Sequence, residues 1–180
     1  MVGALDRDDD EVTTQMRLLH WLLRALSDRI MLPLFDLFGG TRDTTLGGRL
    51  CVLYTVGRKS GQPREIPLNF VPTTRGVGLL AGFGRSAGWV YNLRAQPRAT
   101  LLVGSRRYGV TAIELEDRAQ AIAVTRGVLK NAGAMGFFYG WDPRTASDAR
   151  IGSVVDDTLV FELVFDQPPP WAPTRVTSNG

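Results

Sequence analysis

Apolar side chains near the start of this chain recur every three or four residues. Across residues 12 to 31, five of them fall on one side of a helical wheel. They are Met16, Leu19, Leu23, Leu26 and Ile30. This period predicts an amphipathic helix, which Pro33 ends or kinks.

Beyond residue 48 the helical period gives way to short apolar or alternating runs bounded by glycine, proline and polar residues. Runs of this length and composition predict β-strands joined by tight turns. The predicted strands are 50–56, 66–71, 77–81, 99–103, 107–115 and 157–165. Pro67 lies early in the second run, which indicates an edge strand or a strand start.

Two further helices are predicted between these strands. Ser86 is placed to cap a short helix that contains residues 89–93, and Asp117 is placed to cap one that reaches about Lys130. Residues 131–150 have no clean period, and their glycines and aromatic residues indicate a pocket wall or lid. Mostly antiparallel strands with a few helices predict a small β-barrel in an α+β domain.

The stretch GRKSGQPREIP, residues 57–67, lies between the first two predicted strands. Its two glycines permit backbone angles that other residues avoid. Arg58, Lys59 and Arg64 supply three cations, and Ser60 supplies a hydroxyl. A turn of this kind can direct amide N–H groups and cations at one anion, most plausibly a phosphate. The alternative is a solvated basic hairpin with no ligand.

The distribution of charge favours the anion-binding interpretation. Residues 12–110 hold 14 Lys and Arg against 4 Asp and Glu, a net charge of +10, whereas residues 1–11 carry −4 and residues 111–180 carry −3. The positive field is therefore concentrated on the part of the chain that contains the turn.

Composition narrows the classes of function. With 44% hydrophobic and 22% charged residues, the chain has the composition of an ordinary globular protein. Cys51 is the single cysteine, so no internal disulfide forms, and its apolar run predicts a core position. His20 is the single histidine, which excludes a histidine-rich zinc site and weakens a haem site. We predict no metal.

The run LYTVGRKSGQPREIPLNF, followed by an apolar strand and then by GWVYNLRAQPRATLLVG, resembles the deazaflavin-dependent nitroreductase family, whose members bind coenzyme F-420. The resemblance covers roughly residues 48 to 115. It implies a split β-barrel of the FMN-binding kind. It also implies an oxidoreductase that passes a hydride from reduced deazaflavin to an enone, quinone or nitro compound.

The resemblance assigns the cofactor contacts residue by residue. Its phosphate-binding turn corresponds to Arg58, Lys59, Ser60, Gly61 and Arg64. Ile66 and Pro67 fall where the main chain of family members runs along the deazaflavin ring. Trp89 and Asn92 match a segment of the family that lines the cofactor. Arg85 is the residue placed to replace a lysine of the family's second glycine-rich loop, which is shorter here.

The acceptor side is predicted from aromatic residues. Tyr139 is our candidate for the proton donor that accompanies hydride transfer. Phe138 and Trp141 are predicted to form the substrate wall beside it, and Phe70 takes a position that is often a substrate-contacting tyrosine. The expected substrate is a small hydrophobic or conjugated molecule.

Other classes of function fit some of the same residues. An FMN or FAD oxidoreductase on the same barrel also needs a basic turn for its phosphate, so FMN is the second-choice cofactor. A non-catalytic protein that binds a deazaflavin or tetrapyrrole is another alternative. Nucleic acid is not an expected partner, because no basic helix, zinc pattern or RNA-binding aromatic strand is present.

The predicted organisation has four parts. These are a flexible acidic start (1–11), the amphipathic helix (12–40), the deazaflavin-binding barrel (41–166) and an irregular proline-rich tail (167–180). A signal peptide is not expected, so we predict a cytoplasmic protein. The helix either packs on the barrel or contacts a membrane surface, since Trp21 lies beside arginines. The sequence does not predict the oligomeric state.

Overall fold

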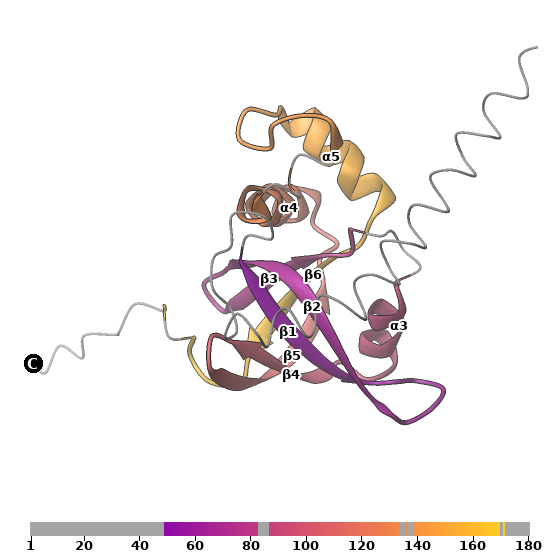
Figure 1. Ribbon diagram of the computed structural model, residues 1–180. Coiled ribbons are helices and arrows are strands. Elements are labelled where there is room, and N and C mark those ends of the chain that lie inside the picture. Colours follow the sequence, from indigo (N-terminus) through magenta and orange to yellow (C-terminus); the bar gives the residue numbers. More distant parts are fainter. Residues whose placement is uncertain (1–48, 83–86, 134–135, 137–138, 170, 172–180) are drawn as a thin grey trace, which may run out of the picture.

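The structure is a computed structural model that describes residues 49–82, 87–133, 136, 139–169 and 171 (Figure 1). In this part of the chain, six antiparallel strands close into a barrel in the order β1-β2-β3-β6-β5-β4. The strands are β1 Leu50–Val56, β2 Pro63–Pro72, β3 Gly76–Leu80, β4 Arg98–Val103, β5 Arg106–Glu114 and β6 Val160–Phe165. The described helices are α3 Gly88–Ala95, α4 Arg118–Asn131 and α5 Asp148–Asp157.

Alternate side chains of the strands fill the barrel. Leu53, Leu79, Leu101 and Leu163 have exposures of 0%, and they belong to one continuous apolar cluster. Trp89 of α3 adds to this cluster, where its ring meets that of Phe161 edge-on with centroids 5.4 Å apart. Helix α3 is therefore fixed to the barrel core by its buried side.

Helices α4 and α5 form a separate layer on the barrel, on the side of β2, β3 and β6 (Figure 1). A second apolar cluster fills the space between this layer and the sheet. Its buried members are Leu80, Ala121, Val128, Leu129, Ile151, Val154 and Val160. The layer lies on a different side of the barrel from α3.

The fold class predicted from the sequence, an α+β split β-barrel, is confirmed. All six predicted strands are present, and Asp117 caps α4 by accepting a hydrogen bond from the Gln120 amide at 2.7 Å. Pro67 lies inside β2, in the part that pairs with β1 alone, because β3 joins only from Phe70 onward. The edge position predicted from this proline is therefore observed.

Three details of the sequence prediction are wrong. The sequence does not predict helix α5. Asp157, the predicted start of the last strand, is instead the last residue of α5, and the strand begins at Val160. The cap of α3 is Ala87, which makes no side-chain capping bond, and not Ser86. Segments 1–11 and 12–40, most of the tail, and residues Ser86, Arg85 and Phe138 lie outside the described residues.

Candidate functional site

Residues 57–62 form the tip of a hairpin in which β1 and β2 pair along their length, from Leu50↔Asn69 to Val56↔Pro63. The Gly57 N–H donates to the Gln62 carbonyl at 2.8 Å, and the Gly61 N–H donates to the Gly57 carbonyl at 2.8 Å. Gly61 has a φ of 66°, a left-handed conformation that strongly favours glycine. Local bonds therefore fix the shape of this turn.

The amide groups of the turn are already engaged with the protein. Those that donate to protein acceptors are the amides of Gly57, Arg58, Ser60, Gly61 and Gln62. Only the Lys59 amide has no acceptor among the described residues. The prediction that several amides point at one anion is therefore wrong, and an anion at this turn must be held mainly by side chains.

The side chains of the turn supply that donor set. Arg58, Lys59, Ser60 and Arg64 are all exposed. A Cβ built on Gly57 would lie 2.7 Å from Ser60 Oγ and 3.5 Å from Arg64 Nε, so these two side chains flank the same point of the backbone. Within the described residues, none of the three cations forms an ion pair with a carboxylate. Their charge is available to an anionic ligand.

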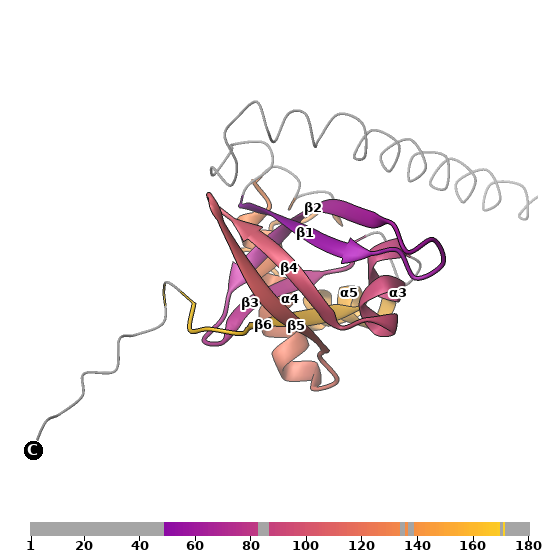
Figure 2. The same cartoon turned by 90° about the horizontal axis from the view of Figure 1, so that it is seen from below.

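Helix α3 lies beside this turn in the views of Figure 1 and Figure 2. The Arg58 amide donates to Asn92 Oδ1 at 3.1 Å, and Asn92 Nδ2 donates to Thr55 Oγ1 at 3.2 Å. Asn92 is 7% exposed. Both ends of its amide are thus bonded to the β1 end of the hairpin, so Asn92 positions the turn.

Helix α3 is itself held near its C-terminal end by an ion pair. Arg94 Nε and Nη2 donate to the two carboxylate oxygens of Glu114 in β5 at 2.9 and 2.8 Å. The hydrogen bonds to Glu114 raise the pKa of Arg94 above its ordinary value. Together with the buried Trp89, this pair makes α3 a fixed support for the turn.

Removing the Asn92 side chain tests this support. Asn92→Ala leaves the Arg58 N–H without its acceptor, and we expect a loss of about 1 to 3 kcal/mol in the free energy of unfolding. Urea denaturation of the cofactor-free protein measures it. The control is Asn69→Ala, which also removes an amide bonded to a main-chain group of the β1 region but lies far from the tip of the hairpin. Equal stability of Asn92→Ala and the natural protein would contradict the positioning role.

The predicted ring-binding residues lie further along the hairpin. Ile66 pairs with Leu53 and Pro67 pairs with Val52, and both are half-buried. No described strand pairs with the other edge of β2 before Phe70. Among the described strands, this stretch of β2 is therefore paired on its β1 side only, and it continues from the cationic turn.

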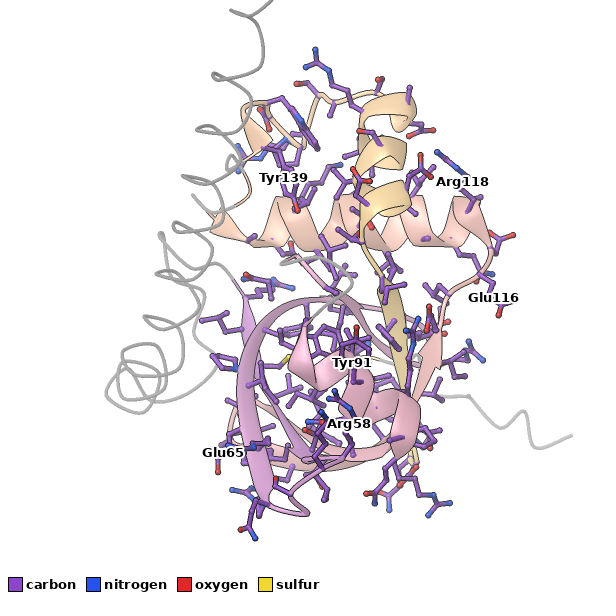
Figure 3. All side chains as sticks on the ribbon, turned by 90° about the vertical axis from the view of Figure 1, so that its right-hand side faces the viewer. Arg58, Glu65, Tyr91, Glu116, Arg118 and Tyr139 are labelled. Carbon is purple, nitrogen blue, oxygen red and sulfur yellow. The ribbon has the colours of Figure 1, made fainter. Side chains whose placement is uncertain are left out.

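The predicted acceptor residues are not brought to the turn. Tyr139 and Trp141 pack against each other with ring centroids 5.7 Å apart, and both join the cluster beneath α4 and α5. In Figure 3 Tyr139 lies by this layer, whereas Arg58 and Tyr91 lie together at the hairpin. Phe70 is 5% exposed and belongs to the barrel core.

The thiol of Cys51 is also buried in the barrel wall, with 0% exposure, and donates to the Leu68 carbonyl at 3.4 Å. Burial raises the pKa of this thiol far above its ordinary value, so it stays protonated at neutral pH. We expect no alkylation by iodoacetamide in the folded protein at about pH 8, and full alkylation after denaturation. Mass spectrometry reads this directly, and rapid labelling of the folded protein would refute it.

A family model described as F420H(2)-dependent quinone reductase matches residues 29–137. The match includes more than half of the chain, with the turn, the hairpin and α3. The chain belongs to the F420H(2)-dependent quinone reductase family. This assignment confirms the deazaflavin-dependent resemblance found in the sequence.

Two curated relatives from Mycobacterium tuberculosis support the assignment. F420H(2)-dependent quinone reductases of Mycobacterium tuberculosis strains CDC 1551 and H37Rv are 31% identical over 106 residues, covering 54% of this chain and 70% of each relative. Among solved structures, a conserved hypothetical protein from Mycobacterium tuberculosis has a TM-score of 0.49 and 17% identity, covering 66% of this chain and 74% of that chain. An F420-H2 dependent reductase has a TM-score of 0.39 and 21% identity, covering 63% and 93%.

Sequence reasoning missed two residues that the structure adds to the site. Thr55 accepts the bond from Asn92, and Tyr91 lies beneath the Arg58 guanidinium. An exposed tyrosine next to a buried asparagine on a short helix is a visible signal. The partner of these residues is Arg58, which lies 34 residues before Asn92. The sequence pattern alone does not place residues so far apart next to each other.

Proposed function

We propose that this protein is a reductase that transfers a hydride from reduced coenzyme F-420 to a quinone-like acceptor. The observation that carries the proposal is the turn at Arg58, Lys59 and Arg64, whose cations have no carboxylate partner in the described structure and which α3 holds in place. Family membership then gives these cations a ligand.

The donor set at the turn suits the coenzyme. Its phosphodiester and glutamate tail are anionic, and guanidinium, ammonium and hydroxyl groups are good partners for such oxygens. We propose that Arg58, Lys59, Ser60 and Arg64 hold these anions. The edge of β2 at Ile66 and Pro67, which no described strand covers, then accepts the flat ring system. Arg85 is a further proposed contact outside the described residues.

The protein supports the reaction by orientation and charge. When bound, the reduced deazaflavin supplies the hydride, and a quinone that accepts this hydride with one proton becomes a hydroquinone. The barrel core behind β1 and β2 fixes the strand edge, because Leu53 and Leu101 are fully buried there. The cationic turn binds the anionic part of the coenzyme, away from its reacting ring. This binding holds the ring in a fixed orientation for hydride transfer.

Tyr139 remains our proposed proton donor. Burial raises the pKa of its phenol, so the group keeps its proton at neutral pH and over any ordinary assay range. Its separation from the turn is compatible with this role because the coenzyme is an extended molecule. We expect Tyr139→Phe to lower turnover about tenfold or more while leaving the coenzyme dissociation constant unchanged. Full turnover in this variant would remove Tyr139 from the mechanism.

An anaerobic assay tests the proposed reaction. Purified protein is mixed with reduced coenzyme F-420 and a naphthoquinone, and the absorbance of the oxidised deazaflavin is followed. We expect quinone-dependent oxidation that needs the protein, with one hydroquinone formed per coenzyme oxidised. Coenzyme binding without quinone reduction would overturn the acceptor class. Reduced FMN is run in parallel, because FMN is the second-choice cofactor.

We also propose that segment 12–40 brings the protein to membrane surfaces, where lipophilic quinones dissolve. Its amphipathic pattern beside arginines supports this proposal. No helix in the described part of the chain is long and apolar enough to span a membrane. We expect the full chain to co-sediment with anionic vesicles and a variant without residues 1–40 to stay in the supernatant. Equal sedimentation of the full and the shortened chain would oppose the proposal.

A further inference from the structure

Arg58 differs from the other cations of the turn because α3 holds it twice. Its main-chain N–H donates to Asn92 Oδ1 at 3.1 Å, and its guanidinium carbon lies 4.5 Å from the centroid of the Tyr91 ring. Tyr91 and Asn92 are neighbours in α3, so consecutive residues fix the main chain and the side chain of one arginine. Figure 3 shows Arg58 and Tyr91 together beside this helix.

We propose that Tyr91 is a positioning residue that pre-orients the Arg58 guanidinium for the phosphodiester of the bound coenzyme. This inference rests on the proposed function and goes beyond it. In this proposal Arg58 contacts the phosphodiester with a defined geometry, whereas Lys59 and Arg64 attract it through their charge alone.

The contact between Arg58 and Tyr91 suits this role. The Tyr91 ring lies on one side of the Arg58 guanidinium, and the Arg58 side chain is otherwise exposed. An arginine that contacts a ring in this way keeps its N–H groups for other partners, and a phosphate can accept two of them.

Pre-orientation lowers the cost of binding. A free arginine loses much of its rotamer freedom when a ligand immobilises it. Here the ring of Tyr91 has already restricted the side chain, and α3 is anchored by Trp89 and by the Arg94–Glu114 pair. Tyr91 is 38% exposed, one of three large apolar side chains with such exposure in the described structure. Among the described residues the Tyr91 ring belongs to no core cluster, so it contributes little to the core, and the ring contact recorded for it is the one with Arg58.

The chain offers a matched control. Arg107 lies over the Tyr54 ring with the same 4.5 Å separation, on the outer side of the barrel wall formed by β1, β4 and β5. Arg107 also donates to the Tyr54 hydroxyl at 3.4 Å. Replacing Tyr54 breaks a second arginine–tyrosine contact while Arg58, Tyr91 and Asn92 all stay in place.

The test is a fluorescence titration of coenzyme F-420 with the natural chain and with Tyr91→Leu, Tyr91→Phe, Tyr54→Leu, Arg58→Ala and the double variant Arg58→Ala/Tyr91→Leu. We expect Tyr91→Leu to weaken binding about threefold and Tyr91→Phe to restore affinity to within about twofold, because phenylalanine keeps the ring. In the Arg58→Ala background, Tyr91→Leu should cause no further loss. Tyr54→Leu should bind like the natural chain.

Two readouts separate positioning from a general structural effect. Tyr91→Leu keeps every charge of the turn, so its affinity should keep the salt dependence of the natural chain, whereas Lys59→Ala should reduce that dependence. In the cofactor-free protein, NMR should show Arg58 side-chain protons shifted upfield by the Tyr91 ring, and this shift should vanish in Tyr91→Leu.

The outcomes are distinguishable. If the natural chain does not bind the coenzyme, the proposed function fails and this inference falls with it. If the natural chain binds, but Tyr91→Leu is without effect or adds fully to Arg58→Ala, the inference alone is overturned. Absence of the upfield shift would also overturn it, whatever the titrations show.

Discussion

Replacing Arg58 and Lys59 together by alanine is expected to weaken binding of coenzyme F-420 at least about tenfold, because each of the two side chains is proposed to donate charge-assisted hydrogen bonds to an anion of the coenzyme. The melting temperature of the cofactor-free protein should not fall. Both side chains are exposed, and alanine keeps the amide of residue 58 that donates to Asn92. Fluorescence titration measures the dissociation constant, and calorimetry measures the melting temperature.

The control removes the same charge elsewhere. Arg144→Ala/Arg150→Ala takes two positive charges from exposed positions in and before α5, on the helical layer away from the hairpin. We expect this variant to bind the coenzyme within about twofold of the natural chain, because solvent and salt screen distant surface charges. Equal losses in both variants would mean that net charge, and not the turn, attracts the coenzyme.

Gly76→Ala is expected to destabilise the fold by about 3 kcal/mol or more, with a fall in melting temperature on the order of 10 °C. Gly76 pairs with Val164 where β3 meets β6. A Cβ at this position would lie 1.9 Å from the Leu163 carbonyl oxygen, which is main chain and has little freedom to move. Strands β3 and β6 would have to move apart, and the closed barrel would lose hydrogen bonds between them.

Gly82→Ala provides the comparison. A Cβ built on Gly82 meets no atom of the described residues within 4 Å, so the same substitution adds a methyl group without a described clash. We expect its free energy of unfolding, measured by urea denaturation, to stay within about 0.5 kcal/mol of the natural chain. A Gly76→Ala variant as stable as Gly82→Ala would show that the β3–β6 seam relaxes easily.

The barrel and its basic turn follow from local sequence signals. The β1 run alternates Cys51 and Leu53 into the core, and Gly57 and Gly61 mark the hairpin tip. Helix α4 was likewise predicted, because Asp117 is a strong capping residue. Each of these signals lies within a few residues of the feature that it predicts.

Helix α5 was missed because its stability comes from packing. Its ten residues include Gly152, and its larger apolar side chains, Ile151, Val154 and Val155, are β-branched, which lowers helix propensity. Ile151 and Val154 are buried against the α4 layer, and Ser147 caps the helix by accepting from the Arg150 amide at 3.4 Å. Only the serine was available as a signal in the sequence.

The sequence pattern also does not predict that the amides of the turn donate to acceptors within the protein. Glycine and basic residues predict that a turn binds anions, but not which way its N–H groups point. The decisive contact joins Arg58 to Asn92, 34 residues apart, and appears only when α3 docks on the barrel. For the same reason the sequence suggested Asn92 as a direct cofactor contact, whereas its amide is bonded to the protein.

The most direct test of the account is an equilibrium titration of the natural chain with coenzyme F-420, with FMN titrated in parallel at low and at physiological salt. We expect saturable binding of the deazaflavin with a micromolar or lower dissociation constant, and this constant should rise as the salt concentration increases. Failure to bind the deazaflavin, or binding of FMN alone, would contradict it.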